Sequence, residues 1–102
     1  MLKVKHNMKI LEYNDLDLTN LKKQYKKVIS FLEHDDFHSA EVKKMAEQDY
    51  YRAKLDDASR LLFKIVHYQG ERYALILEVI HQHHYEKSRF LRGAKVDDAK
   101  IP

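Results

Sequence analysis

A chain of 102 residues with 44% hydrophobic side chains can bury one modest core, so we expect a single domain over residues 1–102. The absence of cysteine excludes disulfides, thiolate zinc sites and a cysteine nucleophile. The net charge of +3 favours a phosphate polymer as partner, although the lysines of LKKQYKK could instead simply solvate the outer face of a helix.

The first half of the chain predicts one strand followed by two helices. Residues 8–13, MKILEY, alternate apolar and polar side chains as a strand does, and NDLDLTN supplies turn and cap residues. From Leu18 to about Glu33 apolar residues recur at intervals of three and four, which predicts a helix. Ser39 is the cap candidate of a second, shorter helix that would contain Val42 and Met45.

The second half predicts three consecutive strands. YYRAKL, SRLLFKIVHY and RYALILEVIHQHHY are rich in β-branched and aromatic residues, and the short connections DDA and QGE separate them. The order of elements predicts an α+β domain, in which an N-terminal strand and a two-helix pair pack on an antiparallel sheet of three to four strands. Residues 86–102 would form a C-terminal extension or the start of a linker, and EKSRFL could add a last helical turn.

No apolar run approaches the ~18 residues that a membrane span needs, and the opening MLKVKHNMKI lacks the apolar centre of a signal peptide. We therefore expect a cytoplasmic protein without a membrane partner. There are no internal repeats and no low-complexity segments.

The last two strands predict a hairpin that pairs His67 with Tyr73 and uses Gly70 at a positive φ. In this register one face of the hairpin is apolar and carries Leu61, Phe63, Ile65, Leu75, Leu77 and Val79. The opposite face collects Arg60, Lys64, Glu78, Gln82 and His84, because side chains alternate with a period of two. Arg60 would lie opposite Ile80 and within reach of the strand end that carries His84 and Tyr85.

A guanidinium, an imidazole and a phenol at one end of a basic sheet suit the cleavage of a phosphodiester without a metal. Arginine can neutralise charge on the phosphate, histidine can protonate the leaving oxygen, and tyrosine can stack on a base. The structural alternative is a surface salt bridge between Arg60 and Glu78, with the histidines as polar residues at a strand end. His81 and His83 share a face and could hold a metal, but two ligands without a nearby acidic pair favour no metal site.

The stretches YYRAKLDDASRLLFKIV and LILEVIHQHHY resemble the second half of the RelE/ParE toxin superfamily, and most of all its YoeB-like branch. The matching pieces are the aromatic-arginine pair Tyr51 and Arg52, the strand SRLLF with Arg60, and the His-Tyr pair His84 and Tyr85. The resemblance extends roughly over residues 8–85, and it is most specific in the last three strands.

The resemblance implies an endoribonuclease (an mRNA interferase) that cleaves RNA, usually on the ribosome, through attack of a ribose 2′-hydroxyl, and that an antitoxin protein holds inactive. Arg60 would stabilise the phosphate, His84 would act as general acid, and Tyr85 would contact the base or phosphate. The general base would be a glutamate, either Glu41 or Glu47. The RNA-binding candidates are Arg52, Lys64 and Lys87, and no cofactor or metal is expected.

The toxins of this family end close to the His-Tyr pair, whereas this chain continues through EKSRFLRGAKVDDAKIP. That continuation favours an alternative, in which a RelE-like domain of a larger helicase-like protein has lost turnover and binds nucleic acid or protein. A third alternative, a ParE-like protein that targets DNA gyrase, is favoured least because that branch does not use the His-Tyr ending.

Overall fold

The computed structural model of the protein describes residues 8–46, 49–82 and 84–101. Its elements in chain order are β1 (Lys9–Glu12), α1 (Lys22–Glu33), β2 (Lys43–Lys44), β3 (Tyr50–Lys54), β4 (Ser59–Tyr68) and β5 (Glu71–His81), followed by two short 3-10 turns, η1 (Tyr85–Lys87) and η2 (Asp98–Lys100). The fold is therefore α+β, as the sequence predicts. Within the described part of the chain, no helix has the length and apolar character that crossing a bilayer requires.

The five strands form one mixed sheet in the order β1-β5-β4-β3-β2. The three long strands β3, β4 and β5 are antiparallel neighbours, as predicted. The first strand corrects the prediction of a purely antiparallel sheet, because β1 pairs parallel to β5, with Ile10 opposite Ala74. A parallel pair needs a long connection, and the helix and β2–β4 supply it here.

The described residues contain one α-helix, so the predicted two-helix pair is wrong. The segment after α1 forms turns instead, in which the Ser39 amide donates to the Asp36 side chain at 3.1 Å and Glu41 has a positive φ of 50°. That backbone conformation cannot continue a helix. Lys43 and Lys44 then pair with β3 as a short edge strand.

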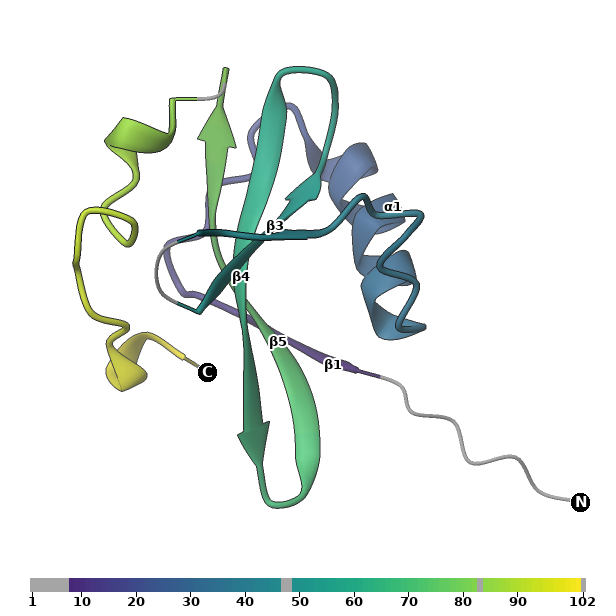
Figure 1. Ribbon diagram of the computed structural model, residues 1–102, viewed down its shortest axis with the longest axis vertical. Helices are drawn as coiled ribbons and strands as arrows, with labels where there is room; N and C mark the ends of the chain where they lie inside the picture. Colours follow the sequence, from purple (N-terminus) through teal and green to yellow (C-terminus); the bar gives the residue numbers. More distant parts are fainter. Residues whose placement is uncertain (1–7, 47–48, 83, 102) are drawn as a thin grey trace, which may run out of the picture.

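The sheet is covered on both faces, by α1 on one and by residues 84–101, which we call the C-terminal segment, on the other (Figure 1). On the α1 face, Val28 and Leu32 of the helix belong to one core with Leu61, Phe63 and Ile76. On the other face the central residue is Phe90, which is 1% exposed. The second core around it contains Tyr13, Tyr50, Leu62, Leu75, Leu77 and Ile80.

A bulge at Leu62/Phe63 divides the register of the long hairpin in two. At its open end Arg60 lies opposite Ile80, as predicted. At the loop end Tyr73 pairs with Val66 rather than with His67, which is a slip of one residue. The turn uses positive φ at both central residues, 50° at Gln69 and 78° at Gly70, as a two-residue hairpin loop of type I′ requires.

The bulge shifts the pairing of β5 by one residue, and a shift of one residue moves every following side chain to the other face of the sheet. Residues of β5 before and after the bulge that simple alternation would put on one face therefore lie on opposite faces. Val79 belongs to the same core as Leu61 and Phe63, as predicted. Leu75 and Leu77 instead face the C-terminal segment, which corrects the predicted apolar face.

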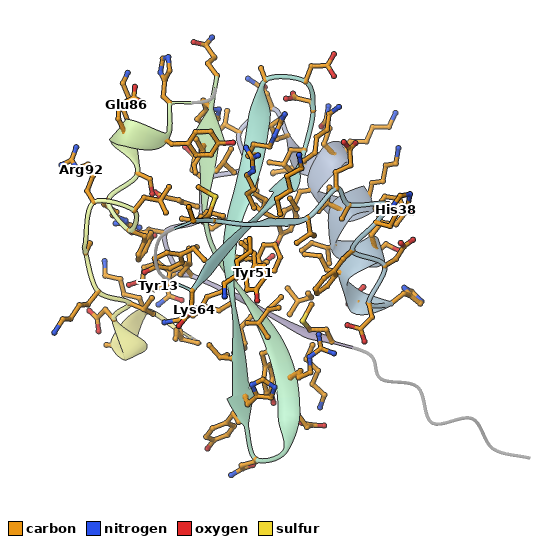
Figure 2. All side chains as sticks on the ribbon, viewed as in Figure 1. Tyr13, His38, Tyr51, Lys64, Glu86 and Arg92 are labelled. Carbon is orange, nitrogen blue, oxygen red and sulfur yellow. The ribbon has the colours of Figure 1, made fainter. Side chains whose placement is uncertain are left out.

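The C-terminal segment is tied to the loop after β1 at several points. The Asp97 amide donates to the Tyr13 hydroxyl, and the Asn14 amide donates to the Lys100 carbonyl, both at 2.9 Å. The Arg89 guanidinium donates to an Asp15 carboxylate oxygen at 2.7 Å. In Figure 2 the labelled Tyr13 lies between the sheet and this segment, whereas Glu86 and Arg92 point outward.

The Asp15–Arg89 pair predicts an acid dependence of stability. The hydrogen bond from Arg89 is the largest influence and lowers the pKa of Asp15. Burial opposes this shift, and the positive charges of Arg89 and Lys100 lower the pKa further. A lowered folded-state pKa stabilises the protein above the unfolded pKa of about 4, and this stabilisation is lost as pH falls through the folded value. Urea unfolding of the wild type and of Asp15→Asn between pH 6 and 2 should therefore give stability curves that converge at the acid end. Parallel curves would contradict this account.

Candidate functional site

Basic side chains form a row on the sheet face that the C-terminal segment covers. Arg52 and Lys54 lie on β3, and Arg60 and Lys64 lie on β4. They share one face because residues directly opposite in an antiparallel pair point the same way, and Lys54 lies opposite Arg60. This arrangement concentrates positive charge on one side of a protein whose net charge is only +3.

Arg52 and Tyr85 are in direct contact. Arg52 Nη1 donates to the Tyr85 hydroxyl at 2.5 Å, and the guanidinium carbon lies 5.5 Å from the centre of the Tyr85 ring. Tyr85 begins the 3-10 turn η1, three residues after β5 turns away from the sheet at Gln82, whose φ is 50°. The aromatic-arginine strand and the His-Tyr pair of the sequence therefore meet in space.

His84 follows the end of β5, and its amide donates to the His81 carbonyl at 2.9 Å. The residue is half-buried, and no described side chain forms a hydrogen bond or ion pair with its imidazole. Around it lies an open hollow of about 590 Å³. Glu78, His81, Lys87 and Ser88 also line this hollow, so it contains a carboxylate, a second imidazole, an ammonium and a hydroxyl.

Glu78 is a site residue that the sequence prediction did not assign to catalysis. It lies opposite Leu62 on the same face as Arg52, and its carboxylate accepts a hydrogen bond from the hydroxyl of the buried Ser88. A carboxylate in the middle of the apolar run YALILEVI is the signal that marks it in the sequence. The predicted alternative, an Arg60–Glu78 salt bridge, is not formed.

The Arg60 side chain is hydrogen-bonded to main-chain carbonyls at the start of its own strand. Its Nη1 donates to the carbonyl of Asp56 at 2.7 Å and to that of Ser59 at 3.0 Å, which fastens the turn between β3 and β4. The residue lies at the same end of the sheet as His84, since Arg60 is opposite Ile80 and Ser59 is opposite His81. Binding a phosphate there requires its side chain to leave the turn carbonyls.

The two predicted glutamates are placed differently. The Glu41 carboxylate lies 3.8 Å from Lys54 Nζ, at the β2 side of the basic row. Glu47 lies outside the described residues. Of the RNA-binding candidates, Arg52 and Lys64 belong to the basic row, and Lys87 is exposed at the rim of the hollow beside His84.

Metal-binding groups do not gather in the part of the chain that the structure describes. It contains no group of three or more histidine, aspartate or glutamate side chains placed to hold an ion. His81 is exposed, and His83, its proposed companion, lies outside the described residues.

The protein is similar to a known protein in fold but not in sequence. No model of a known protein family matches the sequence, and no curated protein matches it. Among solved structures, a YoeB/ParE toxin from Agrobacterium tumefaciens is similar in fold, with a TM-score of 0.53 and 8% sequence identity. The similarity covers 74% of this chain and 100% of the toxin chain. The fold is therefore RelE/ParE-like, as the resemblance in sequence predicts.

Proposed function

We propose that this RelE/ParE-like protein is a metal-independent endoribonuclease of the RelE/YoeB toxin type. The observation that carries the proposal is the contact between Arg52 and Tyr85 beside His84, at the end of a basic sheet face. The similarity to a toxin at 8% identity supports the scaffold of such an enzyme, and the chemistry rests on these side chains.

In the proposed reaction, a ribose 2′-hydroxyl attacks the adjacent phosphorus atom. The new bond joins O2′ to phosphorus, the bond from phosphorus to O5′ breaks, and the products carry a 2′,3′-cyclic phosphate and a 5′-hydroxyl. His84 donates the proton that the leaving O5′ takes up. Arg60, released from the turn carbonyls, and Arg52 neutralise the charge that develops on the phosphate. Tyr85, held by Arg52, contacts the base or the phosphate.

A carboxylate would accept the proton of the 2′-hydroxyl. Glu78 is the better placed candidate because it lines the same hollow as His84. Glu41, the glutamate that an ungapped match to the toxins indicates, lies beside Lys54 at the other side of the basic row. Both are within the face to which we assign RNA, and single substitutions to glutamine would separate them by their effect on the cleavage rate.

The proposed partners follow from the same scheme. The substrate is RNA, bound on the ribosome, and the location is the cytoplasm where ribosomes translate. An antitoxin protein is the proposed inhibitor. It would act by covering the hollow or by displacing the side chains that line it.

One observation favours a second candidate function, a catalytically inactive module that binds nucleic acid or protein within a larger chain. The C-terminal segment packs on the same sheet face as the basic row, and Arg60 is held by main-chain carbonyls. Both features restrict access to the site. A binding module would tolerate them, whereas an enzyme must move at least the Arg60 side chain.

Incubation of the purified protein with end-labelled RNA, with and without ribosomes and in excess EDTA, tests the proposed function. We expect discrete fragments in EDTA, because no step uses a metal. Cleavage only after metal addition, or no cleavage with or without ribosomes, would remove the ribonuclease assignment. Binding of RNA without any cleavage would then favour the second candidate.

A further inference from the structure

A second recess lies on the same sheet face, toward the loop end of the long hairpin. It has a volume of about 890 Å³ and runs between β4, β5 and residues 93–96 of the C-terminal segment. The loop end of the hairpin, which carries Tyr68 at one end of this recess, extends beyond both α1 and the C-terminal segment (Figure 1). We call this recess the tyrosine groove.

Three tyrosines, Tyr50, Tyr68 and Tyr73, line the groove. Tyr73 lies opposite Val66, and Tyr68 follows Val66 by two residues, so the two hairpin tyrosines are diagonal neighbours on one face. Tyr68 is 63% exposed, so its side chain is open to a ligand. Burial raises the pKa of Tyr50, which keeps its phenol neutral in the floor of the groove.

The charged side chains that line the groove are basic. Lys64 and Lys95 line it from opposite sides, and His67 also belongs to the lining. The nearby carboxylate of Glu71, which lies opposite Tyr68, accepts a hydrogen bond from the Tyr73 hydroxyl at 3.3 Å and pairs with Lys9 at 2.9 Å. Lys64 Nζ lies 5.7 Å from the centre of the Tyr50 ring, so an ammonium and an aromatic face are presented together. The groove therefore offers flat rings for stacking and cations for a phosphate backbone.

We propose that the tyrosine groove binds single-stranded RNA, with bases stacked on Tyr68 and Tyr73 and the backbone held by Lys64 and Lys95. Alternating aromatic and basic groups are the chemistry by which proteins bind single strands without reading their sequence. An acidic peptide would use the lysines but would leave the exposed tyrosine rings without a matching partner. A duplex keeps its bases stacked on one another and cannot use the rings.

This inference rests on the proposed function for the choice of RNA, and it deepens that function by giving the substrate strand a path. The groove and the hollow beside His84 lie on one sheet face, joined by the basic row of β3 and β4. A strand held in the groove would reach the hollow along Lys64 and Arg52. The groove depends on residues 93–96, which follow the His-Tyr pair. The toxins that this sequence resembles end close to that pair.

The test uses a single-stranded 2′-O-methyl oligonucleotide that contains 2-aminopurine, so that binding is measured without any cleavage. We expect binding by fluorescence anisotropy and quenching of 2-aminopurine as it stacks. Tyr68→Ala should weaken binding by roughly 5- to 100-fold and relieve the quenching, whereas Tyr68→Phe should retain both. Lys95→Ala should reduce the slope of log affinity against log salt by about 0.7, and Lys22→Ala, an equal charge change on the exposed face of α1, should not.

Equal affinity of the wild type, Tyr68→Ala and Lys95→Ala would overturn the inference, because RNA would then bind elsewhere and the groove would be free for a peptide. Equal affinity for duplex and single strand, or no binding of either, would also overturn it. The two proposals fail separately. If oligonucleotide binding depends on Tyr68 but ordinary RNA is not cleaved, only the proposed ribonuclease activity is excluded. If RNA is cleaved but binding does not depend on Tyr68, only the proposed RNA binding in the tyrosine groove is excluded. Thermal unfolding of each variant checks that the fold is intact, and we expect melting temperatures close to that of the wild type because the substituted side chains are exposed.

Discussion

Replacing His84 with alanine is expected to lower the rate of RNA cleavage by about 100- to 10,000-fold, the usual cost of removing a positioned general acid. The imidazole lies in a hollow with Glu78 and Lys87, and no described side chain forms a hydrogen bond with it. Its ring nitrogens are therefore open to a bound substrate. Because the residue follows the end of β5 and is only half-buried, the variant should fold and should still bind RNA.

The matched control for this prediction is His81→Ala. His81 is an exposed histidine three residues earlier, in the last position of β5, and it also borders the hollow. It lies opposite Ser59, so its side chain is on the α1 face of the sheet rather than on the face of Arg52 and Glu78. Its removal should therefore change the cleavage rate far less. Arg60→Ala is a less clear test, because that guanidinium also fastens the turn between β3 and β4. An unchanged cleavage rate in His84→Ala, with the variant folded, would exclude His84 as the acid.

Replacing Phe90 with alanine is expected to lower the free energy of unfolding by about 3–5 kcal/mol, the typical cost of truncating a fully buried phenylalanine. The Phe90 ring meets Tyr13 edge-on at 5.4 Å between ring centres and Tyr50 at 6.4 Å. It is the residue of the C-terminal segment that enters the second core most deeply, with 1% of its surface exposed. A loss of this size is a large part of the stability of a small domain.

Arg92→Ala is the control, since Arg92 lies two residues away and points outward (Figure 2). Its effect should stay within about 0.5 kcal/mol. Urea unfolding of both variants gives the comparison. A cost below about 1 kcal/mol for Phe90→Ala would mean that the packing of the C-terminal segment on the sheet contributes little to stability. The segment would then be a cover that can detach from the sheet rather than a part of the core.

Much of the fold follows from local pattern. The strands β3 and β4 match their β-branched and aromatic runs, and α1 ends at Glu33 as predicted, although it begins at Lys22 rather than at Leu18. The strand β5 ends at His81, four residues before the predicted end at Tyr85, because the backbone turns at Gln82 with a positive φ. The second helix failed because spacing over one or two turns is weak evidence, and a left-handed Glu41 with an edge pairing of Lys43 and Lys44 was the alternative. The bulge at Leu62/Phe63 and the parallel pairing of β1 depend on contacts far apart in sequence, which periodicity does not report.

The sequence predicted only those features of the candidate site that depend on local periodicity. Alternation along one strand assigned Arg60 and Lys64 to one face, and the observed pairing of β3 with β4 adds Arg52 to it. The contact of Arg52 with Tyr85 depends on how the chain turns at Gln82, and the place of Glu78 depends on where Ser88 packs. Neither turn nor packing leaves a periodic signal. The tyrosine groove also escaped prediction, because half of its wall belongs to a segment without regular strands or helices.

The chemical ends of the cleaved RNA test the central claim most directly. If the wild-type protein cleaves through 2′-hydroxyl attack, the upstream fragments formed in excess EDTA should end in a 2′,3′-cyclic phosphate, and the downstream fragments should begin with a 5′-hydroxyl. One 2′-deoxy substitution at the cleaved nucleotide should abolish that cut and leave the others. Products with a 3′-hydroxyl and a 5′-phosphate, or an undiminished cut at the 2′-deoxy position, would contradict the mechanism that we assign to His84, Arg52 and Tyr85.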